Sequence, residues 1–409
     1  MRAGREARSC CNTDDAPAAK APSKVRILTA HNYYLEPGGE DEVFSSEARL
    51  LEDRGHTVLR HSTDNRRTLG MSRIEVAAKA VWNRKAGREL GSLIERRRPE
   101  VVHFHNTFPL LSPACYGAAR ARGAAVVQTL HNYRLLCPNA LLERGGSACE
   151  SCLGRAVAWP GVLHGCYRRS RAATAAVAGM SAVHRAAGIW ANAVDLYVAL
   201  TAFARSRFVA GGLPAGKIVV KPNFVWPDLG AGTETGGYAV FAGRHMEEKG
   251  LGVLAGAWER LNGSPPLKTV GGGPDEAVLG GVTGVELLGH RPRAEVLGLM
   301  RQAAFLVFPS LCYEGLPMVI LEAFCCGLPV IASRLGAMAE IIEDGRTGLL
   351  FTPGDAADLA AKVEWLLAHP VALARMRREA RAEFEAKYTA ARNYEMLMEI
   401  YERARASRN

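Results

Sequence analysis

The sequence predicts an α/β protein with two doubly wound domains, each built on a parallel sheet. Three observations predict this class. The chain has 409 residues, which is more than one hydrophobic core usually serves. Short apolar runs alternate with segments of helical periodicity, as expected when helices connect parallel strands. Residues 221–237 are rich in proline and glycine and separate two such series, so they indicate a linker.

The apolar runs give the expected strands and domain limits. The first series is Val25–Thr29, Val101–Phe104, Ala125–Leu130, Leu196–Leu200 and Ile218–Val220. The second series is Tyr238–Ala242, Leu267–Val270, Val285–Leu288, Phe305–Phe308, Pro329–Ala332 and Leu349–Phe351. We therefore expect a first domain at residues 24–225, a second at 226–389 and a C-terminal helix within 390–409. Residues 1–23 carry several arginines and no apolar core, so they are expected to be a disordered extension.

The charge balance limits the classes of partner. The net charge is +10, from 51 Lys and Arg against 41 Asp and Glu. Such a balance suits nucleic acid, an anionic membrane face or phosphorylated small molecules. Nucleic acid is disfavoured because no basic module interleaved with aromatic residues is found. No run of 18 apolar residues is found either, so no membrane-spanning helix is expected.

The expected location is a reducing cytoplasm. The ten cysteines show no spacing typical of a secreted disulfide framework, and no secretory signal is found at the N-terminus. Residues 72–98 add a second possible location, the inner face of the membrane. Ser72 and Glu75 predict a capped start to one amphipathic helix with an apolar side and a basic remainder. It either faces the core with a solvated basic face or contacts anionic lipid at the inner face of the membrane.

Two glutamates give the strongest functional signal. Glu314 and Glu322 follow the apolar run Phe305–Ser310, so Glu314 is expected at the carboxyl end of a strand, where ligands bind in open α/β sheets. Glu322 is expected in a helix that begins near Pro317, where it can accept hydrogen bonds from a ribose diol. The backbone amides expected to bind phosphate there are those of Gly315, Leu316, Met318 and Val319. Groups suited to bind a sugar, a diphosphate and a ribose together predict a nucleotide-sugar pocket.

A pair of cations opens the second domain. A strand delivers Arg244 to its carboxyl end, and Lys249 follows at the next turn. Together they can clamp a diphosphate and stabilise the charge that grows on a leaving phosphate. The chain contains no Asp-x-Asp of the type that metal-dependent transferases use, so no catalytic metal is expected. A surface pair near a turn is the alternative.

Glycines and histidines at other strand ends are weaker candidates. Gly273 belongs to Gly271–Pro274, which either lines the crevice or forms a plain tight turn. Gly38 and Gly39 lie between the first strand and a helix, and such a loop can lie against a phosphate. His131 ends a strand and could hydrogen-bond a sugar hydroxyl. His103 and His105 are as well explained by a structural role as by a functional one.

The cysteines after His131 form a cluster in the sequence. Cys137, Cys149, Cys152 and Cys166 lie in an insert at residues 137–166 and include one C-x2-C pair. Four thiolates can hold a structural zinc ion, which would order an insert with few apolar residues. Reduced thiols in a packed loop, or a redox pair, are the alternatives.

Taken in order, these motifs resemble a known family. Gly243-Arg244, Glu248-Lys249-Gly250, Gly271–Pro274, Phe308–Ser310 and Glu314 with Glu322 look like the signature of the family-four retaining glycosyltransferases, of the bacterial exopolysaccharide or glycoconjugate type. The resemblance spans about residues 24–405 and implies the GT-B fold, in which two Rossmann-like domains face each other across a cleft. One departure is His245-Met246, where leucine and a small or polar residue are commoner.

The resemblance also assigns roles. It implies metal-independent transfer from a nucleoside-diphosphate sugar, with Arg244 and Lys249 on the diphosphate and Glu314 on the donor sugar. It implies that Glu322 holds the ribose, that Gly38 and Gly39 match the glycine loop of the first domain, and that His131 lies beside the sugar. The final helix would cross back to the first domain.

The expected activity is hexosyl transfer from a UDP- or GDP-sugar to a glycan, a lipid-linked saccharide or a small molecule. A nucleotide-sugar 2-epimerase, a glycan phosphorylase and a non-catalytic nucleotide-sugar-binding protein are the alternatives.

Overall fold

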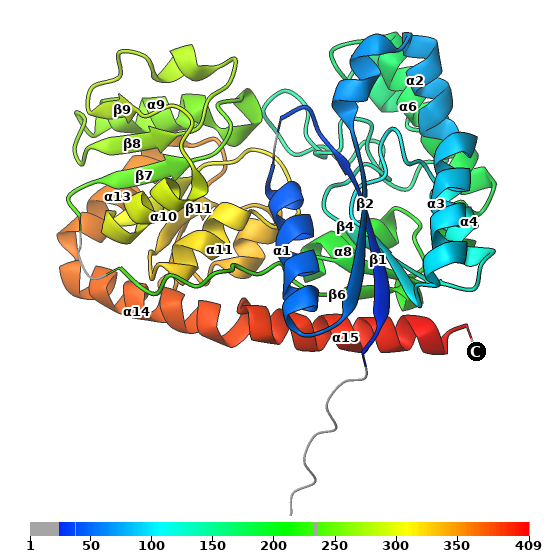
Figure 1. The fold of residues 1–409 in the computed structure, drawn as a ribbon. Coiled ribbons are helices and arrows are strands. Elements are labelled where there is room, and N and C mark those ends of the chain that lie inside the picture. Colours follow the sequence, from blue (N-terminus) through cyan, green and yellow to red (C-terminus); the bar gives the residue numbers. More distant parts are fainter. Residues whose placement is uncertain (1–23, 37, 233–235, 409) are drawn as a thin grey trace, which may run out of the picture.

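A computed structural model describes residues 24–36, 38–232 and 236–408. The predicted extension at residues 1–23 lies outside the described residues. Two α/β halves lie side by side, and two consecutive helices run along the base of both (Figure 1). Among the described residues, no helix combines the length and the apolar character needed to cross a membrane.

The first sheet has six parallel strands in the order β2-β1-β3-β4-β5-β6. They are β1 (Arg26–Tyr33), β2 (Thr57–Asp64), β3 (Val101–Phe104), β4 (Ala125–Leu130), β5 (Leu196–Ala199) and β6 (Ile218–Val220). The prediction missed β2, because it searched for apolar runs. This edge strand pairs only with β1, and none of its residues is fully buried.

The second sheet has six parallel strands in the order β12-β11-β10-β7-β8-β9. They are β7 (Ala239–Ala242), β8 (Leu267–Val270), β9 (Val285–Leu287), β10 (Phe305–Phe308), β11 (Val330–Ser333) and β12 (Gly348–Phe351). All six were expected from their apolar runs. The strand order reverses between β7 and β10, which is the pattern of the doubly wound dinucleotide-binding sheet.

Helices cover both faces of each sheet. The first half contains α1 (Gly39–Asp53), α2 (Arg73–Val81), α3 (Arg84–Arg97), α4 (Ala114–Arg120), α5 (Trp159–His164), α6 (Arg171–Ala186), α7 (Ile189–Asn192) and α8 (Ala202–Ala210). The second contains α9 (Leu251–Arg260), α10 (Arg293–Gln302), α11 (Met318–Cys325), α12 (Gly336–Ile341), α13 (Ala356–Ala368) and α14 (Pro370–Lys387). Short 3-10 turns are η1 (Asn65–Gly70), η2 (Ala215–Lys217), η3 (Glu247–Lys249) and η4 (Glu276–Leu279). Successive strand residues such as Ile27 and Leu28 belong to cores on opposite faces, as expected for a sheet buried on both sides.

The single helix predicted over residues 72–98 is wrong. The structure has two helices, α2 and α3, separated at Trp82-Asn83. Asn83 starts the second helix, because its side chain accepts a hydrogen bond from the N–H of Ala86. Ser72 caps α2 as predicted. Ile74 of α2 is 83% exposed, so it does not extend an apolar side of this helix.

The last helix, α15 (Ala390–Ala406), packs against the first half of the chain (Figure 1). Tyr394, Leu397 and Tyr401 share one core with Ile27 and Val101 of the first sheet. The chain therefore returns to its first sheet after completing the second.

Candidate active site

Loops that follow strand ends of the two sheets meet each other. A Cβ atom on Gly315 would lie 2.5 Å from the carbonyl oxygen of His131, so only glycine fits this approach. The hydroxyl of Tyr133 donates a hydrogen bond to the carbonyl of Glu314 (3.3 Å). The loop after β4 in the first half therefore contacts the loop after β10 in the second.

Lys249 and Glu314 form the centre of this region. The Nζ of Lys249 lies 2.6 Å from Oε1 of Glu314, and each side chain is 14% exposed. The hydroxyl of Ser310 donates to the same carboxylate oxygen (2.7 Å). Lys249 follows β7 and Glu314 follows β10, so the two residues come from the strands that flank the reversal of strand order.

The pair is ionised in this environment. Burial lowers the pKa of Lys249, but the carboxylate of Glu314 outweighs it and the pKa is raised overall. Burial raises the pKa of Glu314, but Lys249 and Ser310 lower it by more, so the pKa of Glu314 is lowered overall. A fixed cation and a fixed anion therefore lie side by side at neutral pH.

Arg244 is exposed on the loop between β7 and η3, and its charge acts on Lys249. This loop packs tightly against the one after β8. A Cβ atom on Gly273 would lie 2.3 Å from the carbonyl oxygen of His245, and one on Gly271 would lie 1.9 Å from that of Gly243. The glycines of Gly271–Pro274 thus let two backbone segments touch, which accounts for Gly273 without a ligand.

The start of α11 faces the first half of the chain. Gly315, Met318 and Val319 are partly exposed and Leu316 is buried. Gly39 approaches this helix, since a Cβ atom there would lie 3.1 Å from Cγ of Met318. Gly38 is fixed by its N–H, which donates to Asp41 Oδ2 (2.9 Å).

The glycine loop of the first half is bordered by carboxylates. Glu40, Asp41 and Glu42 fill the first turn of α1, at the positive end of its dipole. The other oxygen of Asp41 lies 2.6 Å from Nε2 of His31. Burial raises the pKa of Glu40 to about 8. Nothing in the sequence analysis identified these residues, although three successive acidic side chains after a glycine pair are a visible signal.

His131 belongs to a row of histidines at the ends of β1, β3 and β4. Its Nε2 lies 3.0 Å from Nδ1 of His105, and the two rings stack. Burial, together with His31, His103 and Lys221, holds the pKa of His131 well below its usual range, so the imidazole is neutral at pH 7. His103 is fully buried and bonded to Tyr401 and Thr129, which indicates a structural role.

Glu322 lies in α11 with its side chain 12% exposed. Its Oε1 is 2.7 Å from Nε of Arg293, at the start of α10. Sequence reasoning missed Arg293, because no motif connects a residue at one helix start with a glutamate 29 positions later.

The four predicted zinc ligands lie in one irregular segment. Between Leu130 and Trp159, within the described part of the chain, the only β-pairing is an isolated bridge from Glu143 to Ala148. Burial raises the pKa of Cys152 to about 11, and the charges of the other three cysteines act on it in the same direction. The other three thiols are thus close enough to Cys152 to influence its ionisation. In the described part of the chain, however, the four sulfur atoms do not all lie within 4.8 Å of one another.

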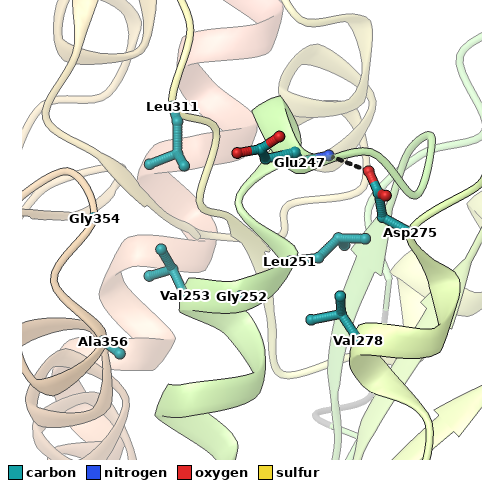
Figure 2. Close-up of a pocket in the computed structure, with 9 residues that line it drawn as sticks. All are labelled: Glu247, Leu251, Gly252, Val253, Asp275, Val278, Leu311, Gly354 and Ala356. Carbon is teal, nitrogen blue, oxygen red and sulfur yellow. Dashed lines mark hydrogen bonds between the residues drawn. The ribbon is translucent and has the colours of Figure 1, made fainter. Parts of the chain in front are cut away.

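A hollow of about 460 Å³ lies elsewhere on the second half (Figure 2). Its lining residues are Glu247, Leu251, Gly252, Val253, Asp275, Val278, Leu311, Gly354 and Ala356. The N–H of Glu247 donates to Asp275 at its edge (2.7 Å). None of the predicted site residues lines it, so we place the candidate site at the strand ends instead.

Two families match this chain in succession. The family described as Glycosyltransferase Family 4 matches residues 37–229, and the family described as Glycosyl transferases group 1 matches residues 236–369. Each of the two sheet domains therefore matches a glycosyltransferase family.

Solved GT-B structures cover nearly the whole chain. Sucrose-phosphate synthase from Thermosynechococcus elongatus superposes with a TM-score of 0.70 at 15% identity, covering 93% of this chain and 100% of that one. HepE from Anabaena, solved with UDP and glucose, gives a TM-score of 0.65 at 17% identity, with 92% and 99% covered. At these identities the likeness shows the fold.

Curated relatives match over shorter segments. The amylovoran biosynthesis glycosyltransferase AmsK of Erwinia amylovora is 29% identical over 51% of this chain and 56% of its own length. An uncharacterized glycosyltransferase of Methanocaldococcus jannaschii is 34% identical over 31% of this chain and 37% of its own. The chain thus matches between about a third and just over half of the length of these relatives.

Proposed function

We propose that this chain is a retaining, metal-independent glycosyltransferase that moves a hexosyl-type sugar from a UDP- or GDP-sugar to an acceptor hydroxyl. The observation that carries the proposal is the Lys249–Glu314 ion pair of 2.6 Å, held where the loop after β10 meets His131 of the first domain. The two matching families support transfer over epimerisation or simple binding.

The donor lies along the strand ends of the second domain in this proposal. Arg244 and Lys249 neutralise the charge that grows on the leaving β-phosphate as the glycosidic bond breaks. Backbone amides of Gly315, Leu316, Met318 and Val319 bind the diphosphate, helped by the dipole of α11. Glu322 accepts the ribose hydroxyls.

The sugar and the acceptor lie on the side of the first domain. Glu314, held by Lys249 and Ser310, binds the donor sugar, and the neutral imidazole of His131 hydrogen-bonds one of its hydroxyls. The acceptor is a glycan, a lipid-linked saccharide or a small molecule, which the first domain contacts in the cytoplasm or against the inner face of the membrane. The acidic turn after Gly39 disfavours a second phosphate there, so we assign Gly39 to the close approach of the domains and Gly38 to the start of α1.

A screen of UDP- and GDP-sugars by thermal shift identifies the donor, since a ligand at 100 times its dissociation constant adds about 2.7 kcal/mol. UDP-sugars come first because HepE was solved with UDP and glucose. Release of nucleoside diphosphate is then measured with and without acceptor, and the anomeric configuration of the product by NMR. Release that does not depend on acceptor contradicts a transferase. An inverted product contradicts retention, and loss of activity to a chelator with rescue by Mg²⁺ contradicts metal independence.

Substitutions at the two glutamates should separate binding from chemistry. Glu322→Ala is expected to raise the donor KM more than it lowers kcat, because ribose contacts are similar in the ground and transition states. Glu314→Ala and His131→Ala are expected to lower kcat, because both side chains lie beside the reacting sugar. Steady-state kinetics of the three variants decide this. The reverse pattern would show that the roles are exchanged.

A structural zinc ion in the cysteine insert remains our prediction from its spacing. Zn–S bonds of about 2.3 Å require closer sulfurs than the structure has, so binding would draw the insert together. Purified protein is expected to contain about one zinc per chain, and Cys149→Ser with Cys152→Ser to lose it. Elemental analysis of protein prepared without chelator is the measurement, with Cys115→Ser, outside the insert, as the control. A zinc content near zero rules the site out.

A further inference from the structure

Arg293 lies where the two domains and the linker meet. Its Nε is 2.7 Å from Glu322 Oε1 in the donor domain, and its Nη1 is 3.3 Å from Glu42 Oε1 in the first turn of α1. The same Nη1 donates to the carbonyl of Trp226 in the linker (3.1 Å). Trp226 is also held by Arg49 of α1, whose guanidinium lies 4.5 Å from the ring centre. One guanidinium therefore connects three separate parts of the chain.

We propose that Arg293 is a positioning residue that orients Glu322 for the donor ribose and couples ribose binding to closure of the first domain through Glu42. The inference rests on the proposed function, because it takes Glu322 as the ribose-binding carboxylate.

The geometry leaves Glu322 able to bind a diol. A carboxylate has about four lone-pair positions, and Arg293 uses one oxygen. Within the described residues no hydrogen bond is recorded to Oε2, which stays available for a hydroxyl donor. Arg293 also fixes the direction of the Glu322 carboxylate. Its guanidinium is planar, and Nη1 is held by the carbonyl of Trp226 while Nε donates to Glu322. It therefore orients Glu322 without displacing the ribose.

Charge explains the coupling to the first domain. Glu42 is close enough to Glu322 to raise its pKa, and Arg293 is the cation between the two carboxylates. Without Arg293, the acidic turn of α1 and Glu322 repel each other across the interface. The first domain then loses an attraction to the donor domain at the point where Gly39 meets Met318.

Protonation gives a second consequence. Burial raises the pKa of Glu322, while Arg293 lowers it; Glu42 raises it further, and Cys326 also interacts with this carboxylate. The ionised carboxylate is the stronger acceptor, and protonation turns one of its oxygens into a donor, so ribose affinity falls as the pH falls through this pKa. Removal of Arg293 raises the pKa, so the loss begins at a higher pH in Arg293→Ala than in the wild type.

The experiment compares a nucleoside diphosphate with its 2′,3′-dideoxy analogue. UDP and GDP are each titrated calorimetrically into the wild type, and the base that binds is used with and without its ribose hydroxyls. The wild type is expected to prefer the ribose form, and Arg293→Ala to lose about tenfold in affinity for it while its affinity for the dideoxy form changes little. Arg293→Lys, which keeps the charge, is expected to recover part of the loss and of the pH profile.

Two controls separate positioning from general damage. Arg291→Ala removes an exposed arginine, just before α10, that pairs at 3.8 Å with Glu295 of that helix, and it should leave the preference unchanged. Glu340→Ala removes a different contact between the domains, the carboxylate that accepts from the N–H groups of Ala202 and Phe203. It should change the affinities for both nucleotide forms alike. Glu42→Ala alone should lower the affinity for the ribose form. The same substitution added to Arg293→Ala should not lower that affinity further.

The outcomes are distinct. A ribose preference in folded Arg293→Ala equal to that of the wild type overturns the positioning role. A tighter Arg293→Ala complex also overturns it, because Arg293 would then compete with the ribose. If the wild type binds neither UDP nor GDP, the proposed function is wrong, and so is the positioning role of Arg293 that rests on it.

Discussion

Lys249→Ala is expected to lower kcat by about 10²–10³-fold, which corresponds to about 2.7–4 kcal/mol of barrier. The ammonium group is a fixed charge with a 14% exposed side chain, on the strand end where the leaving phosphate is proposed to lie. Such a group stabilises the transition state more than the ground state, because the leaving group gains charge only as the bond breaks. Arg244→Ala is expected to act in the same direction.

The variant also leaves Glu314 without its cation, so a control is needed. Lys249→Ala combined with Glu314→Gln removes the unpaired charge, and thermal unfolding reports whether each protein is folded. We expect the double variant to fold at least as well and to stay as inactive as Lys249→Ala. Turnover within about threefold of the wild type in both Arg244→Ala and Lys249→Ala would remove the two cations from the mechanism.

Lys221→Met is expected to destabilise the fold by about 3–5 kcal/mol. Lys221 and Glu47 are each 1% exposed, with Nζ 3.7 Å from Oε2, an ion pair longer than a hydrogen bond. Lys221 also donates to Asn393 of α15, at the end of the first sheet (3.3 Å). Loss of the cation leaves a buried carboxylate uncompensated, which costs more than the pair contributes.

Urea unfolding of three variants tests this prediction. Glu47→Gln combined with Lys221→Met should recover most of the loss, because no charge is then buried alone. Lys85→Met, at a lysine whose side chain is 79% exposed, should stay near the wild type. Burial raises the pKa of Glu47. The deficit of Lys221→Met should therefore be smallest at acidic pH, where this carboxyl is protonated, and should grow as the pH rises through that pKa. A loss below about 1 kcal/mol in Lys221→Met contradicts the argument.

The sequence alone determined most of the strands and the edge of the second sheet on which the candidate residues lie. Apolar runs predicted eleven of the twelve strands in the described residues, because most of these strands are covered on both faces and are apolar along their length. Strand ends and turn residues then placed Arg244, Lys249 and Glu314 on a single edge of the second sheet. These are local signals, since each motif lies within a few residues of the strand that presents it.

Only the tertiary structure decided the edge strand of the first sheet, the break between α2 and α3, and the long-range ion pairs. The edge strand β2 carries polar residues, and the break between α2 and α3 depends on the cap that Asn83 forms. The ion pairs of Arg293 and Lys221 join residues that are far apart in the chain. The periodicity of the sequence does not predict such pairs, because each partner is compatible with an exposed position in its own element. Their roles follow from burial and proximity, which exist only after the two sheets and α15 have packed.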